Sequence, residues 1–192
     1  MGRSVKGTET EKNLFRAFVG ESQARMRYTF FASAAKKEGY EQIAAVFTET
    51  ADQEKEHAKR FFKFLEGGML NIDGTWPAGV IGTTEENLRE AADGEYEEWH
   101  DLYCAWADVA DSEGFAAVAT VFRNIATVEA EHEKRYRKLL KHIEENDVFS
   151  RPQPIHWQCR NCGYVHEGKE APESCPACAH PQAYFEPMKQ NY

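Results

Sequence analysis

Two segments of the chain carry the same pair of residues, a glutamate followed three positions later by a histidine: Glu54 with His57, and Glu129 with His132. Three residues turn an α-helix by about 300°, so both side chains of each pair project from nearly the same face. Each glutamate also falls in an apolar stripe of helical period, where a core residue is expected. The repeated pattern predicts two metal-binding half-sites facing the inside of a helical bundle.

Further carboxylates interrupt the apolar stripes of two other predicted helices, Glu21 in one and Glu95 with Glu98 in the other. Buried carboxylates without partners are costly and repel one another, so we expect cations among them. One Glu from each of two helices, with Glu-x-x-His from each of two others, is the ligand pattern of ferritin-like di-iron proteins. The alternative is a set of solvated helix charges. We interpret three neighbours that fall off the inward faces in this second way: Glu56, Glu97 and Glu131.

The two halves of the helical region repeat each other. Shifting the chain by 75 residues superposes Tyr28 on Tyr103 and the first Glu-x-x-His pair on the second. Glu21 instead matches Glu95 at an offset of 74, so the second copy has one extra residue between Glu95 and Tyr103. Single insertions inside helices are often absorbed by a π-helical bulge, and we predict one here.

The periodicity also predicts the domain organisation. A helical bundle is expected over residues 1–146, a linker with two prolines over 147–156, and a small metal-binding domain over 157–192. The glycine-rich segment 67–83 is long for a hairpin loop, which predicts a crossover from the second helix to the third, with an active-site lid as the alternative. Capping boxes and turn glycines are expected at the helix ends: Thr8 with Glu11, Thr83 with Glu86, Gly39 and Gly114.

Four of the five cysteines form two Cys-x-x-Cys knuckles near the C-terminus: Cys159, Cys162, Cys175 and Cys178. Two such knuckles predict a tetrahedral Cys₄ site, whose metal would supply folding energy to a segment too small for a hydrophobic core. Disulfides are the alternative. Iron and zinc both accept this ligand set, and a one-electron carrier beside a two-metal centre favours iron. The fifth cysteine, Cys104, is expected to be a buried, inert thiol.

Charge and hydropathy restrict the partners. The net charge of −9 argues against nucleic acid as a partner. No apolar run approaches membrane-spanning length, and the N-terminal residues show no signal-peptide pattern. We therefore expect a cytoplasmic protein without membrane attachment.

Several longer motifs accompany the two Glu-x-x-His pairs: Gly20-Glu21-Ser22-Gln23-Ala24-Arg25, Glu95-x-x-Glu98, Cys159-Arg160-Asn161-Cys162-Gly163-Tyr164 and Cys175-Pro176-Ala177-Cys178. In these motifs, and over nearly its whole length, the chain resembles the rubrerythrin family, which joins a ferritin-like di-iron domain to a rubredoxin domain. The resemblance implies a mainly α fold, a four-helix bundle with a long crossover between its second and third helices. A small rubredoxin-like β domain would follow it.

The resemblance also implies the roles of the ligands. Glu54 and Glu129 would bridge two irons, and the first iron would exchange Glu98 for His57 between its oxidised and reduced states. The terminal ligands would be Glu21 on the first iron, and Glu95 and His132 on the second. We expect Tyr28 and Tyr103 to donate hydrogen bonds to ligating carboxylates, with core packing as the alternative. Zinc could replace iron at either the di-iron or the Cys₄ site.

The implied function is a non-haem di-iron peroxidase that reduces hydrogen peroxide to water in defence against oxidative stress. Electrons would pass one at a time through the Fe(Cys)₄ centre, from an NAD(P)H-dependent reductase or a rubredoxin, in a head-to-tail homodimer. We expect four residues to serve catalysis, with Glu98 as the proton donor: Glu98, His57, Tyr28 and Tyr103. Three alternatives remain open at this point: iron storage or ferroxidase activity, an oxygen-activating oxygenase, and a zinc-ribbon interaction protein.

Overall fold

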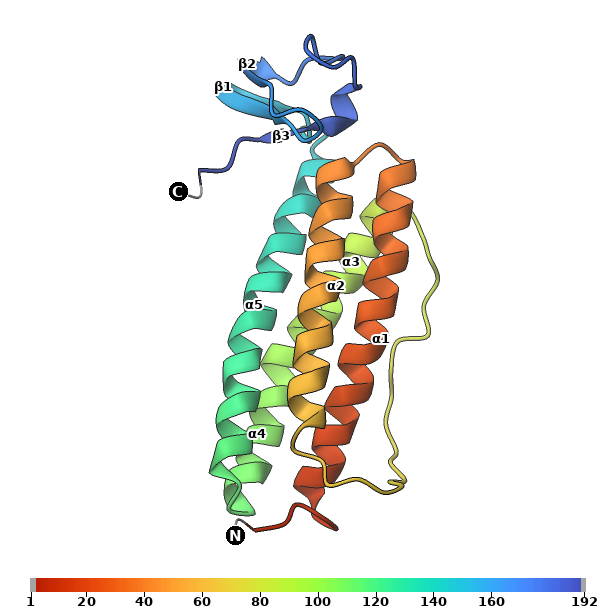
Figure 1. Ribbon diagram of the computed structural model, residues 1–192, viewed down its shortest axis with the longest axis vertical. Helices are drawn as coiled ribbons and strands as arrows, with labels where there is room; N and C mark the ends of the chain where they lie inside the picture. The colour runs from red at the N-terminus through yellow and green to blue at the C-terminus, as the bar shows by residue number, and fades with distance from the viewer. Residues whose placement is uncertain (1–2, 191–192) are drawn as a thin grey trace.

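The computed structural model describes residues 3–190 as a long bundle of helices with a small sheet domain at one end (Figure 1). The helices are α1 (Glu9–Lys37), α2 (Glu41–Phe62), α3 (Thr84–Glu97), η1 (Glu98–Leu102), α4 (Tyr103–Ser112) and α5 (Ala116–Glu144). Because α3, η1 and α4 follow one another without a break, they form a single rod, and the bundle has four rods. The predicted four-helix bundle is confirmed.

The rods form two helical hairpins, α1 with α2 and α3–α4 with α5. Their turns contain Gly39 (φ +85°) and Gly114 (φ +83°), in the left-handed region that favours glycine. The preceding glutamates make equivalent contacts in the two halves. Glu38 accepts hydrogen bonds from the backbone N–H of Thr84 at the start of α3, and Glu113 accepts one from that of Thr10 at the start of α1. The internal repeat is therefore visible in the packing as well as in the sequence.

The two expected capping boxes differ in the structure. Thr83 and Glu86 make the complete reciprocal pair at the start of α3. Thr8 accepts from the backbone N–H of Glu11 at the start of α1, but the Glu11 carboxylate accepts instead from the N–H of Gly7, 2.8 Å away. This carboxylate therefore stabilises the turn before α1.

The π-helical turn predicted between Glu95 and Tyr103 is present as η1. The backbone N–H of Tyr103 donates to the carbonyl of Glu98, five residues earlier, which is the hydrogen bond that defines a π-helix. The extra residue of the second repeat is thus accommodated without ending the helix.

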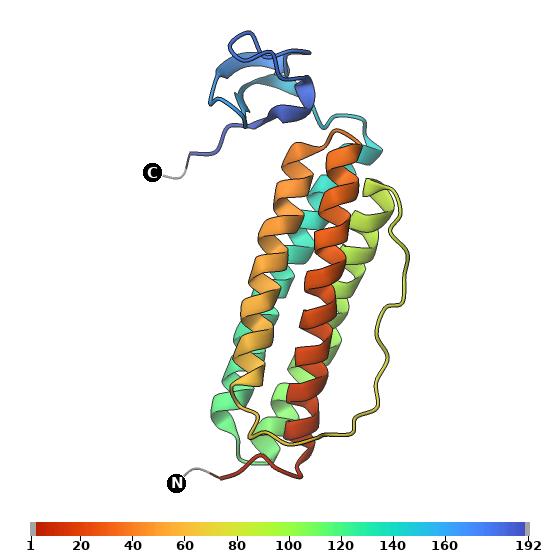
Figure 2. The same cartoon turned by 45° about the vertical axis from the view of Figure 1, so that its right-hand side comes forward.

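The segment 63–83 crosses the bundle from the end of α2 to the start of α3. It contains no helix or strand and runs along the outside of α1 and the α3–α4 rod (Figure 2). The predicted crossover is confirmed. It covers one side of the bundle close to the helices that carry Glu21 and Glu98.

The buried apolar residues form two clusters along the bundle. One includes Phe47 and Tyr136, whose ring centroids lie 5.1 Å apart, and the other includes Phe61 and Phe122, 4.8 Å apart. On each rod the glutamate of interest falls between residues of the two clusters, as Glu54 does between Ala51 and Phe61 on α2. The carboxylates therefore occupy a polar layer between two apolar cores.

The tail is an antiparallel sheet of order β2-β1-β3, made of β1 (Ser150–Cys159), β2 (Val165–Glu170) and β3 (Phe185–Pro187), with a short helix η2 (Gln182–Tyr184). Its core is small and centres on Trp157 and Phe185. Ser150 already pairs with Glu170, so β1 begins inside the segment 147–156 that we predicted as a linker. Only residues 145–149 separate α5 from β1.

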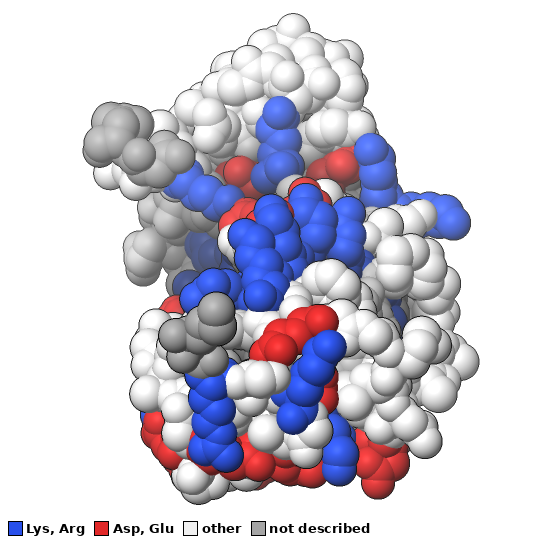
Figure 3. All heavy atoms as spheres, turned by 60° about the horizontal axis from the view of Figure 1, so that its bottom comes forward, with Lys and Arg blue, Asp and Glu red and all other residues white. Residues whose placement is uncertain are grey.

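In residues 3–190, no helix combines the length and apolar character needed to cross a membrane. The surface charges are unevenly distributed. On the face seen in Figure 3, lysine and arginine side chains gather in the middle, although the whole chain carries a net charge of −9.

Candidate metal centres

Four glutamates, one from each rod, meet in the polar layer of the bundle. They are all at most 1% exposed to solvent: Glu21, Glu54, Glu95 and Glu129. His132 is buried beside them, and His57 lies at the edge of the layer with 14% of its side chain exposed. The expected solvated charges do lie outside: Glu56, Glu97 and Glu131 are exposed.

Glu54 and Glu129 are shared between two half-sites. One oxygen of each lies 2.9 Å from Nδ1 of His57. The other oxygen of Glu54 lies 3.1 Å, and that of Glu129 2.8 Å, from Nδ1 of His132. Glu21 is closer to the His57 half, at 3.9 Å, and Glu95 to the His132 half, at 3.6 Å. The donor atoms form two adjoining groups, each compact enough for one metal ion.

The electrostatics of this cluster show how much negative charge it holds. Burial and the neighbouring Glu54 raise the pKa of Glu95 to about 8, and burial and Glu129 raise the pKa of Glu21. Burial opposes the ionised form of Glu54 as well, but the two histidines outweigh it and lower its pKa to about 2. The pKa of His57 rises to about 10, since Glu129 and Glu54 overcome its desolvation. Cations are therefore favoured throughout the cluster.

Several donor atoms in this layer are buried without a hydrogen-bond partner among residues 3–190. They include one oxygen each of Glu21, Glu54 and Glu95, both oxygens of Glu129, and Nδ1 of His132. Buried polar atoms normally have partners, and unpartnered ones that converge on a point fit a bound ion. Carboxylate oxygens and imidazole nitrogens are ligands that iron accepts. The residues present therefore fit a pair of divalent metal ions.

Two tyrosines support the carboxylates across the bundle. The hydroxyl of Tyr28 on α1 donates to Glu95 on α3, and the hydroxyl of Tyr103 on α4 donates to Glu21 on α1, both at 2.6 Å. Burial raises the pKa of both phenols, so they remain protonated donors. Both tyrosines therefore pack in the core and also donate a hydrogen bond. Each hydroxyl donates to a carboxylate of the other hairpin.

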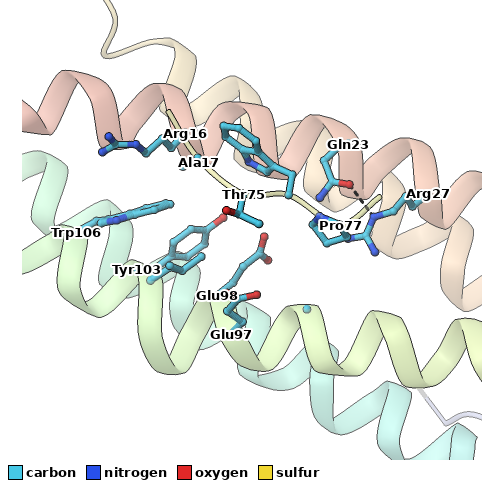
Figure 4. Close-up of a pocket in the computed structure, with 15 residues that line it drawn as sticks. Arg16, Ala17, Gln23, Arg27, Thr75, Pro77, Glu97, Glu98, Tyr103 and Trp106 are labelled. Carbon is cyan, nitrogen blue, oxygen red and sulfur yellow. Dashed lines mark hydrogen bonds between the residues drawn. The ribbon is translucent and has the colours of Figure 1, made fainter. Parts of the chain in front are cut away.

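Glu98 lies outside both groups of donor atoms, whereas His57 is part of one of them. Figure 4 shows its carboxylate directed into a cavity of about 330 Å³ between α1, the crossover segment and the η1 region. Burial and the charge of Glu95 raise the pKa of Glu98.

Sequence reasoning missed two residues near the site. Oε1 of Gln53 accepts a hydrogen bond of 2.9 Å from Nε2–H of His132 and so holds the far side of that ring. Trp76, on the crossover, lines the cavity in front of Glu98. The position of Gln53 next to Glu54 was the only available signal, and nothing in the sequence of the crossover pointed to Trp76.

The four tail cysteines converge as predicted. Sγ of Cys159 lies 3.8 Å from that of Cys178, and Sγ of Cys162 lies 3.7 Å from that of Cys175. A tetrahedron with metal–sulfur bonds of about 2.3 Å has edges of about 3.8 Å, whereas a disulfide bond is about 2.05 Å long. The geometry therefore fits one tetrahedral metal ion and excludes the disulfide alternative.

The prediction for Cys104 is wrong, because this residue is exposed rather than buried. Its Sγ contacts the carbonyl of Trp99 at 3.3 Å. Tyr103, one position earlier, faces the core, and successive residues of an α-helix point about 100° apart, so Cys104 faces outward.

Comparison with known proteins gives the family. The profile of the Rubrerythrin family matches residues 12–140, and that of the Rubrerythrin, rubredoxin-like domain matches residues 157–186. The chain belongs to the rubrerythrin family. It is 69% identical over 192 residues to a rubrerythrin of Porphyromonas gingivalis, covering 100% of this chain and 96% of that one. A rubrerythrin of Nitratidesulfovibrio vulgaris is 54% identical over 190 residues, covering 99% and 100%.

The fold agrees with that of a rubrerythrin relative of known structure. Nigerythrin in a mixed-valence state superposes with a TM-score of 0.62 at 31% identity, over 97% of this chain and 92% of the other. Membership of the rubrerythrin family makes the chain an iron-binding oxidoreductase of ferritin-like fold, with a di-iron site in the bundle and a rubredoxin-like Cys₄ site in the tail.

Proposed function

We propose that this member of the rubrerythrin family is a non-haem di-iron peroxidase that reduces hydrogen peroxide to water in defence against oxidative stress. The division of the Glu54 and Glu129 oxygens between two half-sites supports the proposal, because two such half-sites could hold two redox-active ions side by side. Peroxide needs two electrons, and two ferrous ions supply one each.

The ligands follow from the two groups of donor atoms. Glu54 and Glu129 would be shared by the two ions, and Glu21 with His57 would complete the first half-site. Glu98 would take the place of His57 when the metal is oxidised, since an anionic ligand suits the higher charge. Glu95 and His132 complete the second half-site. Zinc could occupy either the bundle site or the tail site without a change of fold.

The surrounding residues handle protons and orientation. Tyr28 and Tyr103 hold Glu95 and Glu21 in place, so these carboxylates stay aimed at the site during turnover. Glu98, directed into the cavity, meets a molecule entering from solvent and gives a proton to the departing water.

Electrons return through the Cys₄ iron from an external donor, either an NAD(P)H-dependent reductase or a rubredoxin. Within one chain the path is long. The tail lies against the start of α2, where Ala183 is 3.7 Å from the place of a Cβ on Gly39. Glu54 lies thirteen residues beyond Glu41, the first residue of α2, about 20 Å away along the helix. This separation favours a head-to-tail homodimer, in which the tail of one chain serves the bundle of the other.

We place the protein in the cytoplasm. All five cysteines are unpaired in the structure, as expected in a reducing compartment. Nucleic acid is not among the partners that we propose.

The test is anaerobic. Fully reduced, iron-loaded protein is mixed with hydrogen peroxide or with air-saturated buffer, and the visible absorption of the ferric Cys₄ centre is followed. The proposal expects fast recovery of the colour with peroxide and slow recovery with oxygen. Faster recovery with oxygen would instead support a ferroxidase or an oxygenase, and a colourless tail despite full iron loading would indicate a zinc ribbon.

Two variants test the exchange of ligands. Glu98→Ala and His57→Ala should keep the fold and the Cys₄ colour but slow the reaction with peroxide. For Glu98→Ala the loss should be about 10²-fold or more, the range of general acid catalysis. Glu97→Ala is the matched control, because Glu97 is the exposed neighbour of Glu98. Normal rates in both variants would contradict the ligand exchange.

Mixing two inactive variants tests the dimer. A Cys175→Ser chain lacks the tail metal, and a Glu54→Ala chain lacks the di-iron site. Co-refolded together, they should regain turnover with an electron donor if the tail of one chain serves the other. No recovery in a mixture that contains heterodimers would exclude transfer between chains.

A further inference from the structure

We propose that the cavity in front of Glu98 binds the alkyl group of small organic hydroperoxides, which the protein reduces to alcohols. The inference rests on the proposed peroxidase function and extends its substrate class. The cavity, lined by α1, the crossover segment and the η1 region, is the place where a substrate would wait before reaching the metals.

The size of the cavity is the first observation. Its volume of about 330 Å³ is far larger than hydrogen peroxide requires, since a water molecule takes about 30 Å³ in the liquid. Pockets for small organic ligands begin at about 300 Å³. There is room for a four-carbon group beside the two oxygen atoms of a hydroperoxide.

Both apolar and polar side chains line the cavity. The apolar ones are Ala17, Trp76, Pro77, Leu102 and Trp106, and the polar ones include Arg16, Gln23, Arg27 and Glu97. Glu98 and Tyr103 also line it, with the Glu98 carboxylate pointing into the space (Figure 4). An alkyl hydroperoxide could place its carbon atoms against the aromatic rings and its O–O bond beside Glu98.

Two glycines, Gly20 and Gly74, shape this cavity. A Cβ on Gly20 would lie 3.6 Å from Oε1 of Glu98 and 4.0 Å from Nε1 of Trp76, so the bare backbone there leaves room between carboxylate and indole. A Cβ on Gly74 would come within 2.5 Å of the Trp76 ring, which requires glycine for the indole to fold back over the chain. The crossover therefore positions Trp76 as a wall of the cavity.

The reaction balances in the same way as that of hydrogen peroxide. The O–O bond of ROOH breaks, two electrons come from the two ferrous ions, and two protons are taken up to give ROH and water. The two protons come from solvent through the open side of the cavity. The Cys₄ centre restores the electrons in two steps.

Binding is tested without turnover. In the zinc-substituted full chain, which is diamagnetic, the indole N–H resonances of the four tryptophans are followed while tert-butanol is added as an inert analogue of the alkyl group. The Trp76 resonance, assigned with Trp76→Phe, should shift in a saturable way. The resonance of Trp157, which is buried in the tail, should remain in place.

Turnover is tested with two oxidants. Reduced, iron-loaded protein is mixed with hydrogen peroxide or tert-butyl hydroperoxide, and the ratio of the two rate constants is measured. Gly20→Ala places a methyl group between the Glu98 carboxylate and the Trp76 indole. It should lower the rate constant with tert-butyl hydroperoxide, relative to that with hydrogen peroxide, at least fivefold. Val80→Ala, at an exposed crossover residue outside the cavity, is the control and should leave the ratio unchanged.

The outcomes separate the two proposals. A Trp76 resonance that does not move, or a ratio that Gly20→Ala does not change, overturns the organic hydroperoxide site. If the wild-type protein reacts slowly with both oxidants while the Trp76 resonance still shifts, the cavity binds the alkyl group but the peroxidase function fails.

Discussion

The hydroxyl of Tyr28 on α1 lies 2.6 Å from Oε1 of Glu95 on α3, and so joins the two helical hairpins at the level of the metal site. Tyr103 makes the equivalent contact with Glu21 in the opposite direction. Each half of the repeat thus supplies the hydrogen-bond donor for a carboxylate of the other half. These two hydrogen bonds therefore make the orientation of the Glu95 and Glu21 carboxylates depend on how the hairpins pack together.

Replacing Tyr28 with phenylalanine should destabilise the bundle. The change leaves a buried oxygen of Glu95 without its donor, which costs about 1–3 kcal/mol. The measurement is the free energy of unfolding of the metal-free chain in urea. Tyr136→Phe is the control, because the Tyr136 hydroxyl is buried without a hydrogen-bond partner among residues 3–190 and should contribute less. Equal losses in the two variants would argue against a special role for the Tyr28 contact.

Removing one tail cysteine should unfold the tail alone. Cys175→Ser breaks the tetrahedral set, and the small core around Trp157 cannot replace the folding energy of the metal. We expect metal analysis to lose the tail ion, near-ultraviolet circular dichroism to weaken, and the helical signal to persist. Cys104→Ser, at the exposed cysteine of α4, should change none of these. Retention of the tail ion by the Cys175 variant would refute the four-ligand site.

The contribution of Glu113 to stability should depend on pH. Hydrogen bonds from Thr10 and from the start of α1 lower the pKa of this carboxyl below its usual value of 4.5. A lowered pKa in the folded state means that the stabilisation is present above pH 4.5 and is lost as the pH falls through the folded-state pKa. Glu113→Gln should therefore cost up to about 1 kcal/mol at pH 7 and progressively less as the pH falls below 4.5.

Urea unfolding at several pH values measures this difference. Glu131→Gln, which makes the same change of charge at an exposed site, is the control and should show no such trend. A cost for Glu113→Gln that stays constant from pH 7 to pH 3 would contradict an interaction of the ionised carboxylate.

Alanine at Gly114 should strain the turn between α4 and α5. The φ of +83° is costly for a residue with a Cβ, by about 1–2 kcal/mol. Gly94→Ala offers a contrast, because Gly94 lies inside α3 and a Cβ there would meet Arg27 at an ordinary 3.8 Å. That variant should be neutral or more stable by up to about 1 kcal/mol. Thermal unfolding of the two variants should give opposite shifts of Tm, and a stabilised Gly114 variant would be inconsistent with the turn described.

Much of the fold was predictable because the apolar periodicity of the chain is strong. The helices, the crossover and the glutamates that interrupt the apolar stripes all follow from spacing along one helix at a time. The π-helical turn was predictable for a different reason. Comparison of the two repeats revealed one extra residue between Glu95 and Tyr103, which no single helix would have shown.

The features that could not be predicted from the sequence depend on contacts between separate segments of the chain. Tyr28 lies two turns from Glu21 on α1 but donates to Glu95, since the partner is chosen by packing across the bundle. Cys104 is exposed because its neighbour Tyr103 faces the core and successive helical residues point about 100° apart, whereas the apolar character of cysteine suggested burial. The cavity beside Trp76 arises where an irregular segment lies over α1, and irregular segments carry no periodicity from which a path can be predicted.

The tail, whose sheet encloses only a few large side chains, has a consequence for protein synthesis. The bundle consists of helical hairpins with mostly local contacts and can fold as soon as it leaves the ribosome, whereas the tail must wait for an ion. A cell short of metal would therefore accumulate chains with finished bundles and unstructured C-termini, which are exposed to proteases. Metal supply would in this way set how much of the newly made protein persists.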